Sequence, residues 1–310
     1  MKSYQEMVSD LSNILENGKL EYKDSIIIGD NSSGKSDVLR KLLNNDTKDQ
    51  FYFIDAVNRY FNIEQITTIK DEKIVYSSEI KKSRLGVDKF NLEDSFYYCR
   101  APRSIEDFYL NFQDEIESLM SKFLGVSFYV RQDSLGWKVY ADGIEIELSS
   151  GYQALLRIFI EVFYFARTKG VCGVVIDELD EFLSVVNSGR IYTFLRQQFP
   201  DLNFIVTTHS ADLIANAYET NLILLNNETF EILDAGDFTS ISQVYDVFQS
   251  LYERKTESEK EQNDNILRRL FNNKMSGIWG DDEQNVLSTL KSSTLTRAQK
   301  LIVSQIEEWK

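Results

Sequence analysis

Short apolar runs alternate along this chain with longer stretches in which apolar residues recur at helical spacing. The apolar runs predict buried strands over residues 24–28, 51–55, 171–176, 204–207 and 222–225. The helical spacing predicts helices over residues 3–16, 37–43, 104–124, 151–169, 182–198 and 212–218. Strands that alternate with helices predict an α/β fold with a mostly parallel sheet. In such a sheet a ligand binds at the carboxyl ends of the strands.

Three further regions complete the predicted organisation. Residues 128–130 and 137–141 flank Asp133-Ser-Leu-Gly136, which predicts an antiparallel hairpin, and residues 143–148 follow it. Residues 56–103 have the least regular pattern, and we interpret them as an insertion. After Ser240 the pattern is helical, and Thr256–Asp264 is strongly charged. We therefore expect a main domain over residues 1–240 and a helical C-terminal appendage over residues 241–310.

Composition narrows the class of protein. The chain has 310 residues, of which 43% are hydrophobic, so it is long and apolar enough to fold around a sizeable core. No apolar run approaches the roughly 20 residues that span a bilayer. The first residues contain no apolar signal-peptide core, so we expect a cytoplasmic protein. Cys99 and Cys172 lack metal-ligand spacing, and we expect Cys172 to lie in the core.

The net charge of −15 argues against broad binding to DNA, which requires clustered Lys and Arg, and favours protein partners. A local basic groove remains a candidate at Lys70–Lys89, which contains Lys73, Lys81, Lys82, Arg84 and Lys89. The simpler interpretation of this stretch is a solvated surface hairpin or loop.

The first segment that carries chemistry is Gly29-Asp-Asn-Ser-Ser-Gly-Lys-Ser36, which fits the pattern G-x-x-x-x-G-K-[ST] between a predicted strand and a predicted helix. Its backbone N–H groups and the following helix N-terminus would bind phosphates. Lys35 would reach the β- and γ-phosphates, and Ser36 would ligate Mg²⁺. The candidate nucleotide-binding residues are Gly29, Asn31, Ser32, Ser33, Gly34, Lys35 and Ser36.

The second segment is Val174-Val-Ile-Asp-Glu178, an apolar strand that ends in two carboxylates. Asp177 is suited to a Mg²⁺ ligand, and Glu178 to a base that activates water. A solvated strand end would have the same pattern. Asp180 continues the acidic run, and a role as a surface or interface residue explains it at least as well as a catalytic role.

Two further segments involve hydroxyl groups and the single histidine of the chain. In Glu147-Leu-Ser-Ser-Gly-Tyr-Gln153, the residues Ser149, Ser150 and Gly151 open a predicted helix, where small donors can bind an anion. The common alternative is a serine that only caps the helix. His209 follows Thr207-Thr208 at a strand end, where it is either structural or a sensor of the γ-phosphate.

In this order, the four segments resemble those of an ABC-type ATPase head of the RecF/SMC/OLD class, within the bacterial ATPases often found in phage-defence modules. The resemblance covers residues 24–225. It implies a P-loop NTPase fold with ATP and Mg²⁺ as ligands, and Lys35, Glu178 and His209 as catalytic residues. It also implies a homodimer or higher homo-oligomer, in which the signature serines of one copy touch the γ-phosphate bound by the other. ATP would then join the copies and its hydrolysis would release them.

The chain departs from this family in three respects. Leu179-Asp-Glu-Phe182 stands where many relatives have Pro-Glu-Asn and a further histidine. The glutamine of the family's Q-loop has no clear counterpart, and Gln65 and Gln113 are only candidates. The chain has no room for the long coiled-coil arms of SMC proteins.

Three functions follow from the resemblance. The first is an ATPase switch that controls a separate effector protein, a nuclease or a toxin, in phage defence. The second is a RecF/SMC-like repair or recombination ATPase acting on DNA, for which only Lys70–Lys89 and Arg268–Arg269 offer basic residues. The third is an OLD-type nuclease, which needs carboxylates on strands, whereas Glu257–Glu261 and Asp281–Glu283 lie in helical context. An ABC transporter subunit is disfavoured because no Q-loop is assignable.

The C-terminal appendage contains many apolar residues between Ile266 and Trp309. They either pack on the rest of the protein or form a docking surface for an effector or a second dimer, and an exposed Trp279 would favour docking.

Overall fold

The computed structural model describes residues 3–30, 32–67, 77–86, 90, 105–166, 172–226, 229–238, 240–245, 259–275, 278–291 and 295–308. The chain divides into two compact units, Met1–Leu251 and Tyr252–Lys310. The sequence pattern placed this division slightly earlier, after residue 240.

A six-stranded sheet forms the centre of the first unit, in the order β2-β6-β7-β1-β8-β9. The first five of these strands are parallel, and β9 is antiparallel to β8. The carboxyl ends of β6, β7 and β1 therefore meet at one edge. The strands are β1 (Ser25–Gly29), β2 (Phe51–Ile54), β6 (Gly173–Ile176), β7 (Asn203–Thr207), β8 (Asn221–Asn226) and β9 (Thr229–Asp234).

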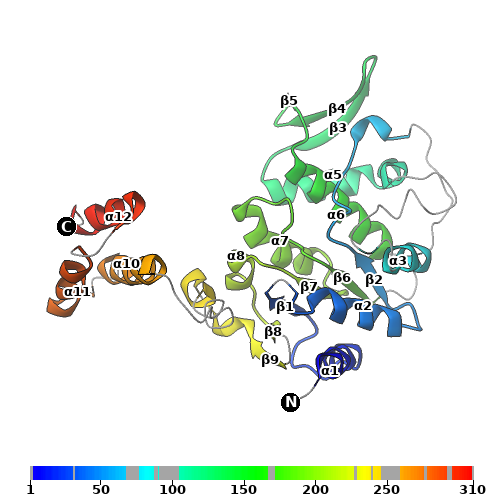
Figure 1. The fold of residues 1–310 in the computed structure, drawn as a ribbon. Coiled ribbons are helices and arrows are strands. Elements are labelled where there is room, and N and C mark those ends of the chain that lie inside the picture. The colour runs from blue at the N-terminus through cyan, green and yellow to red at the C-terminus, as the bar shows by residue number, and fades with distance from the viewer. Residues whose placement is uncertain are drawn as a thin grey trace. The chain divides into compact units, whose positions relative to one another are not determined.

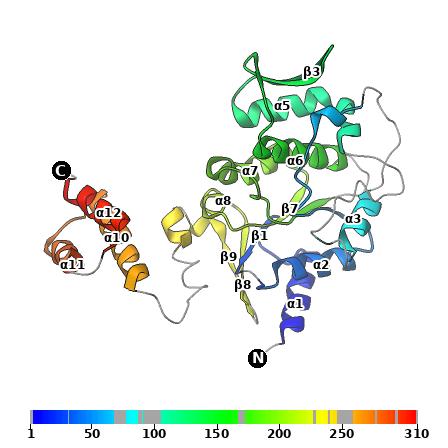
Figure 2. The same ribbon diagram turned by 45° about the horizontal axis from the view of Figure 1, so that its top comes forward.

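Helices cover both faces of this sheet, which is why its inner strands are apolar without interruption. Figures 1 and 2 show α1 (Tyr4–Glu16) and α2 (Lys35–Asn45) on one side, and α6 (Ser150–Ala166) and α7 (Val185–Gln198) on the other. On the first side, Leu11 and Leu39 pack in one core with Ile27, Val175 and Ile205. The prediction of an α/β fold with a mostly parallel sheet is confirmed.

Shorter elements connect these layers. They are η1 (Ile63–Gln65), α3 (Ser77–Leu85), η2 (Ile105–Asn111), α5 (Gln113–Leu124), α8 (Ala211–Ala215) and η3 (Ala235–Asp237). The prediction of one continuous helix over residues 104–124 is wrong, because Phe112 leaves the helical conformation with φ −137°. The Phe112 ring packs edge-on against Phe163 and Tyr164 of α6, so aromatic packing interrupts the helix there.

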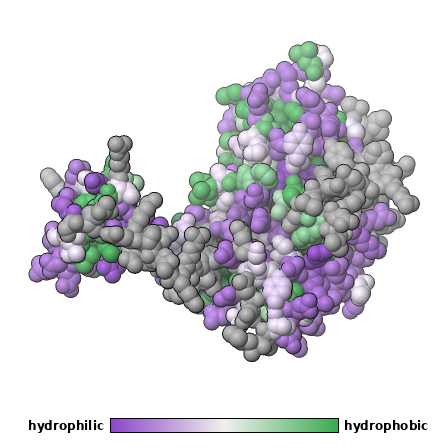
Figure 3. Space-filling view, viewed as in Figure 1, coloured by the Kyte–Doolittle hydropathy of each residue, from purple (hydrophilic) through white to green (hydrophobic). Residues whose placement is uncertain are grey.

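The predicted hairpin is confirmed as a three-stranded antiparallel sheet of β3 (Phe128–Asp133), β4 (Gly136–Ala141) and β5 (Ile144–Ile146). Phe128 and Val130 bury one face of β3 beside α5. Leu135 and Ile144 are exposed, and apolar residues are visible in the upper part of Figure 3, where this sheet lies.

The structure corrects two predictions about polar and reactive side chains. Cys172 is exposed rather than in the core, because β6 begins only at Gly173 and Cys172 lies at the amino end of the sheet. The described part of Lys70–Lys89 is the helix α3 rather than a solvated loop or a basic groove. Lys81 is buried between Asp46 and Asp49 with both contacts at 2.8 Å, and Arg84 is fully buried. Lys70, Lys73 and Lys89 lie outside the described residues.

The second unit contains α10 (Glu259–Met275), α11 (Asp281–Lys291) and α12 (Arg297–Glu308). These helices enclose a core of their own, formed by Leu267, Leu270, Leu287, Leu290, Val303 and Ile306. Trp279 packs half-buried against this core, with the Lys274 Nζ 4.5 Å from its ring centroid. The exposure that would favour docking through Trp279 is therefore not observed. Trp309 lies outside the described residues.

None of the helices in the described parts of the chain is both long enough and apolar enough to cross a membrane.

Candidate functional site

The phosphate-loop sequence forms a tight connection between β1 and α2. β1 ends at the buried Gly29, and α2 begins at Lys35. Gly34 caps α2 with φ 103°, a conformation that favours glycine. A Cβ at this position would lie 2.7 Å from the Tyr4 hydroxyl, so a side chain there would have to displace the Tyr4 ring. The free N–H groups of the first turn of α2 make this loop a site for an anion.

Lys35 and Ser36 join this loop to the acidic strand. Lys35 is buried, and its Nζ donates to the carbonyls of Gly29 at 2.9 Å and Asp30 at 3.3 Å. Burial lowers the pKa of Lys35, and the carboxylates of Glu178 and Asp177 act in the opposite direction. The Ser36 hydroxyl donates to Asp177 Oδ2 at 3.1 Å. The first and second predicted segments therefore meet, although they are far apart in sequence.

A pocket of about 340 Å³ opens beside the loop. It is lined by Tyr4, Asp30, Ser32, Gly34, Lys35, Ser36, Asp37 and Glu178. Ser33 is buried next to Gly29, and its hydroxyl has no hydrogen-bond partner among the described residues. A phosphate oxygen is a group that would satisfy such a hydroxyl. Asn31 lies outside the described residues.

The two carboxylates at the end of β6 are fixed by the neighbouring strand β7. The Thr207 hydroxyl donates to Asp177 Oδ1 at 2.6 Å and accepts from the Glu178 N–H at 2.7 Å. Glu178 has φ 49°, a left-handed conformation that is uncommon outside glycine and concentrates at functional sites. Asp180 accepts a hydrogen bond from the Thr208 hydroxyl, which gives it a structural role in this turn.

His209 lies directly beside the second carboxylate. Its Nε2 is 3.7 Å from Glu178 Oε1, and both side chains are partly exposed, at 41% and 35%. The pKa of Glu178 is lowered chiefly by this polar contact with His209 and further by the charges of Lys35 and Arg59, which outweigh burial. Glu178 is therefore an ionised carboxylate at neutral pH, in a state to accept a proton.

The oxygen atoms at this edge suit a magnesium ion. Ser36 Oγ and Asp177 Oδ2 are the hard donors that Mg²⁺ prefers. No group of three or more His, Cys, Asp and Glu side chains in the described parts of the chain could hold a metal alone. A magnesium ion bound here would take its other ligands from phosphate and water, as is usual for this ion.

The predicted signature segment lies apart from this pocket. Ser149 and Ser150 are exposed at the start of α6, and neither they nor Gly151 belong to the described residues that line the pocket. The Ser149 hydroxyl accepts from the Tyr152 N–H at 3.3 Å, so it does cap the helix. A single chain thus brings together the loop, Asp177, Glu178 and His209, but not the signature serines.

The two candidate Q-loop glutamines are also absent from the described lining of the pocket. Gln113 donates to Glu117 Oε1 and to the Val130 carbonyl, which ties α5 to the hairpin sheet. Gln65 lies in η1.

Tyr4 and Arg59 are among the residues at the site that were not predicted, as are Asp30 and Asp37. Tyr4 lines the pocket, and its hydroxyl donates to Asp37 Oδ2 at 2.5 Å; burial and this contact raise its pKa to about 12. Arg59 is buried and donates to the carbonyls of Asp177 at 3.0 Å and Glu178 at 3.5 Å. A sequence signal for Arg59 existed, because the apolar β2 ends in Asp55-Ala-Val-Asn-Arg59 just as β6 ends in carboxylates.

The chain matches no protein-family model and no curated protein. Among solved structures, it is similar to an SMC head domain from Thermotoga maritima, at 17% identity over 68% of this chain and 89% of that chain, with a TM-score of 0.38. A protein described as a metal-chelate type ABC transporter, in an inward-facing conformation, is similar at 16% identity over 74% and 79% of the two chains, with a TM-score of 0.37.

An SMC head bound to the C-terminal winged-helix domain of ScpA is similar at 17% identity over 41% of this chain, with a TM-score of 0.31. The chain spans only 44% of the length of that protein. With TM-scores below 0.5, these likenesses remain partial.

Proposed function

We propose that this chain is a Mg²⁺-dependent ATPase of the ABC type, in which two copies close around ATP and open after hydrolysis. The supporting observation is the convergence of Lys35, Ser36, Asp177 and Glu178 at the carboxyl ends of neighbouring strands. His209 lies at 3.7 Å from Glu178 at the same edge. Parallel α/β sheets bind ligands at this edge.

Each residue has a role in this proposal. The first turn of α2 and Lys35 bind the phosphates, and phosphate oxygens replace the loop carbonyls that Lys35 now contacts. Ser36 and Asp177 hold Mg²⁺, which neutralises phosphate charge when bound. Glu178 is ionised and orients or deprotonates the attacking water, and His209 faces the same space from β7.

The signature helix and the turn after β6 support the pairing of two copies. Phe182, Val185 and Val186 are exposed at 51%, 67% and 68%. A Cβ at Gly151 would lie 3.3 Å from the Phe182 carbonyl, so this apolar segment adjoins the exposed signature serines. Exposed apolar residues beside an anion-binding helix start are a natural interface. In the proposed dimer, Ser149, Ser150 and Gly151 reach the phosphates bound by the other copy.

We further propose that the dimer controls a separate effector protein, a nuclease or a toxin, in phage defence in the cytoplasm. Support for a protein partner comes from the net charge of −15. Action on DNA has less support, since Lys81 and Arg84 are engaged in buried ion pairs. A built-in nuclease has less support as well, because Asp281, Asp282 and Glu283 form the first turn of α11 rather than strand ends.

The hydrolytic assignment is tested by measuring ATP turnover and Mg·ATP binding in matched variants. Lys35→Ala should lose the binding of Mg·ATP. Glu178→Gln should bind Mg·ATP, but its ATP turnover should be slower than that of the natural protein by about a hundredfold or more. Glu231→Gln, an equivalent change on the exposed edge strand β9, should stay within about twofold of the natural protein. Natural turnover in both Lys35→Ala and Glu178→Gln would overturn the assignment.

A further inference from the structure

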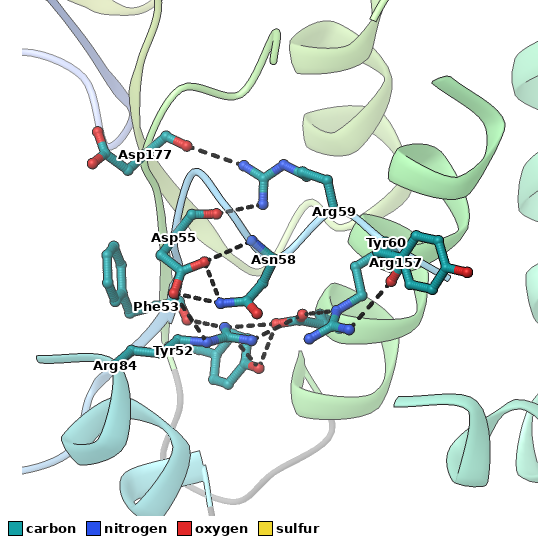
Figure 4. A network of polar contacts seen from close by, with 10 residues as sticks. Tyr52, Phe53, Asp55, Asn58, Arg59, Tyr60, Arg84, Arg157 and Asp177 are labelled. Carbon is teal, nitrogen blue, oxygen red and sulfur yellow. Dashed lines mark hydrogen bonds and ion pairs between the residues drawn. The ribbon is translucent and has the colours of Figure 1, made fainter. Parts of the chain in front are cut away.

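A buried polar cluster fills the space between the end of β2, helix α6 and the acidic strand β6 (Figure 4). Every member is at most 2% exposed. We call this group the β2-exit cluster; it consists of Tyr52, Asp55, Asn58, Arg59, Arg84, Arg157 and Glu161. It contains three guanidinium groups and two carboxylates in the protein interior, where charged groups are costly unless they are paired.

Glu161 of α6 is the centre of the first half of the cluster. It accepts from Arg84 at 2.8 and 3.0 Å, from Arg157 at 2.6 Å and from the Tyr52 hydroxyl at 2.6 Å. Burial alone would raise the pKa of Glu161, but Arg84 and Arg157 outweigh it and lower the pKa to about 2. The carboxylate is therefore held ionised, and its bonds to Tyr52 and Arg84 fix α6 against β2 and α3, whereas Arg157 lies on α6 itself.

The second half of the cluster fixes the loop from Asp55 to Tyr60 at both of its ends. Arg84 Nε lies 3.7 Å from Asp55 Oδ2, and the Asn58 N–H donates to Asp55 Oδ1 at 3.0 Å. At the other end, Arg157 of α6 donates to the Tyr60 carbonyl at 3.3 Å. The helix that carries the signature residues at its start therefore holds this loop directly.

Arg59 extends from this loop to the proposed catalytic residues. Within the described parts of the chain it donates only to backbone carbonyls: Asp55 at 2.6 Å, Asp177 at 3.0 Å and Glu178 at 3.5 Å. Among the described residues, no carboxylate forms an ion pair with it. Burial lowers the pKa of Arg59, so a charge at this position is unfavourable for stability. An apolar side chain would fill the space at a lower cost in folding free energy. The contacts with the backbone carbonyls explain why this position holds an arginine.

We propose that Arg59 is a positioning residue for Glu178, and that the β2-exit cluster connects α6 to it. This inference rests on the proposed function, in which Glu178 acts on the attacking water. Thr207 holds the Glu178 N–H, and Arg59 holds the preceding carbonyl of Asp177 at 3.0 Å and lies 3.5 Å from the Glu178 carbonyl, whose residue has a left-handed conformation. A shift of α6 at the signature segment passes through Arg157 to the loop that carries Arg59.

The decisive variant is Arg59→Lys. A lysine keeps the charge, but its donors come from one atom and do not span the carbonyls of Asp55 and Asp177. We expect kcat to fall about tenfold to a hundredfold, because catalytic groups tolerate little displacement. The Kd for Mg·ATP should change less than about threefold, because the phosphate-binding groups are untouched.

Arg59→Met removes the donor together with the charge. Without the guanidinium, the carbonyls of Asp55 and Asp177 lose their donor, so kcat should fall at least as far as in Arg59→Lys while the Kd for Mg·ATP changes less than about threefold. The matched control is Arg196→Lys, since Arg196 pairs with Asp24 at the amino end of β1, at 2.7 Å. The control should keep its kcat within about twofold.

Arg157→Lys tests the connection to α6. It keeps a positive charge near Glu161 but removes the planar donor to the Tyr60 carbonyl. We expect a lower kcat with an unchanged Kd. In the double variant with Arg59→Lys, kcat should fall no further than in the more impaired single variant, because both act on one loop. If Arg59→Lys does not fold, the kcat of Arg157→Lys tests the inference in its place.

Two results overturn the inference. Natural kcat in folded Arg59→Lys, or in Arg157→Lys if the former does not fold, contradicts it while leaving the proposed function intact, provided that Glu178→Gln is inactive. Turnover that persists in Glu178→Gln contradicts both the proposed function and this inference. Fully additive losses in the double variant contradict the connection to α6.

Discussion

At the scale of single residues, the proposed chemistry depends on how Glu178 is held. Thr207 fixes its backbone N–H from β7, Arg59 contacts its carbonyl, and His209 faces its carboxylate. These contacts come from the ends of two other strands, β2 and β7, and Glu178 combines a left-handed backbone with a lowered pKa. Both properties serve a carboxylate that acts at neutral pH rather than one that only ends a strand.

Replacing His209 should change the pH dependence of hydrolysis. In the natural protein the pKa of Glu178 is lowered, so the carboxylate stays ionised until the pH falls below its ordinary range. In His209→Ala the main cause of this lowering is gone, so Glu178 takes up a proton at higher pH. The acid limb of kcat, measured from pH 8 downwards, should move to higher pH. An acid limb in its original place would show that His209 does not set the protonation of Glu178.

The sequence pattern predicted residues that belong to continuous motifs, and it missed residues that reach the site from elements remote in sequence. Lys35 and Ser36 follow from one continuous motif, and Asp177 and Glu178 from the end of one apolar strand. Arg59 follows the end of an apolar strand, but its partners are backbone carbonyls of remote residues, which the sequence pattern does not identify. Tyr4 reaches the loop from a preceding helix, and such a contact depends on packing that spacing does not reveal.

At the scale of helices and strands, periodicity predicted the inner strands because both of their faces are buried. β9 was missed, since an edge strand is half exposed and its Glu231-Ile-Leu-Asp234 mixes polar and apolar residues. Residues 104–124 have continuous helical spacing, but the packing of Phe112 on α6 divides them. Local pattern thus failed where contacts with another element decide the backbone.

Helix α6 should owe much of its stability to the ion pairs of Glu161. The folded-state pKa is about 2 against an ordinary 4.5, so the stabilisation is complete above pH 4.5 and is lost as the pH falls towards 2. The difference between these two pKa values corresponds to a contribution of about 3 kcal/mol at most to the free energy of unfolding. We expect Glu161→Gln to lower the free energy of unfolding at pH 7 by about 3 kcal/mol, because it leaves Arg84 and Arg157 without their carboxylate.

Urea unfolding of the natural protein and of Glu161→Gln between pH 7 and pH 2 measures this contribution. The difference between the two should shrink as the pH falls below 4.5. A difference that stays constant over this range would show that the lost stability reflects packing rather than the charge of Glu161.

At the scale of the whole molecule, the sheet brings together residues that are remote in sequence, such as Ser36 and Asp177. The signature residues stay exposed outside the pocket of their own chain, next to Phe182, Val185 and Val186. Periodicity predicted a helical C-terminal part, and Tyr252–Lys310 is a compact unit with its own core. The partner of a surface leaves no periodicity in a single chain, so the sequence pattern says less about the assembly than about the elements of the chain.

The most direct test of the ATP-joined pair is the mass of purified Glu178→Gln in solution, measured by mass photometry with and without Mg·ATP. Ser150→Arg in the same background is the matched variant, because an arginine at the exposed start of α6 would obstruct the approach of a second copy. We expect Mg·ATP to shift Glu178→Gln from one copy to two, and to leave the double variant unshifted. Masses of a single copy in all four conditions, in a protein that binds Mg·ATP, would contradict the account.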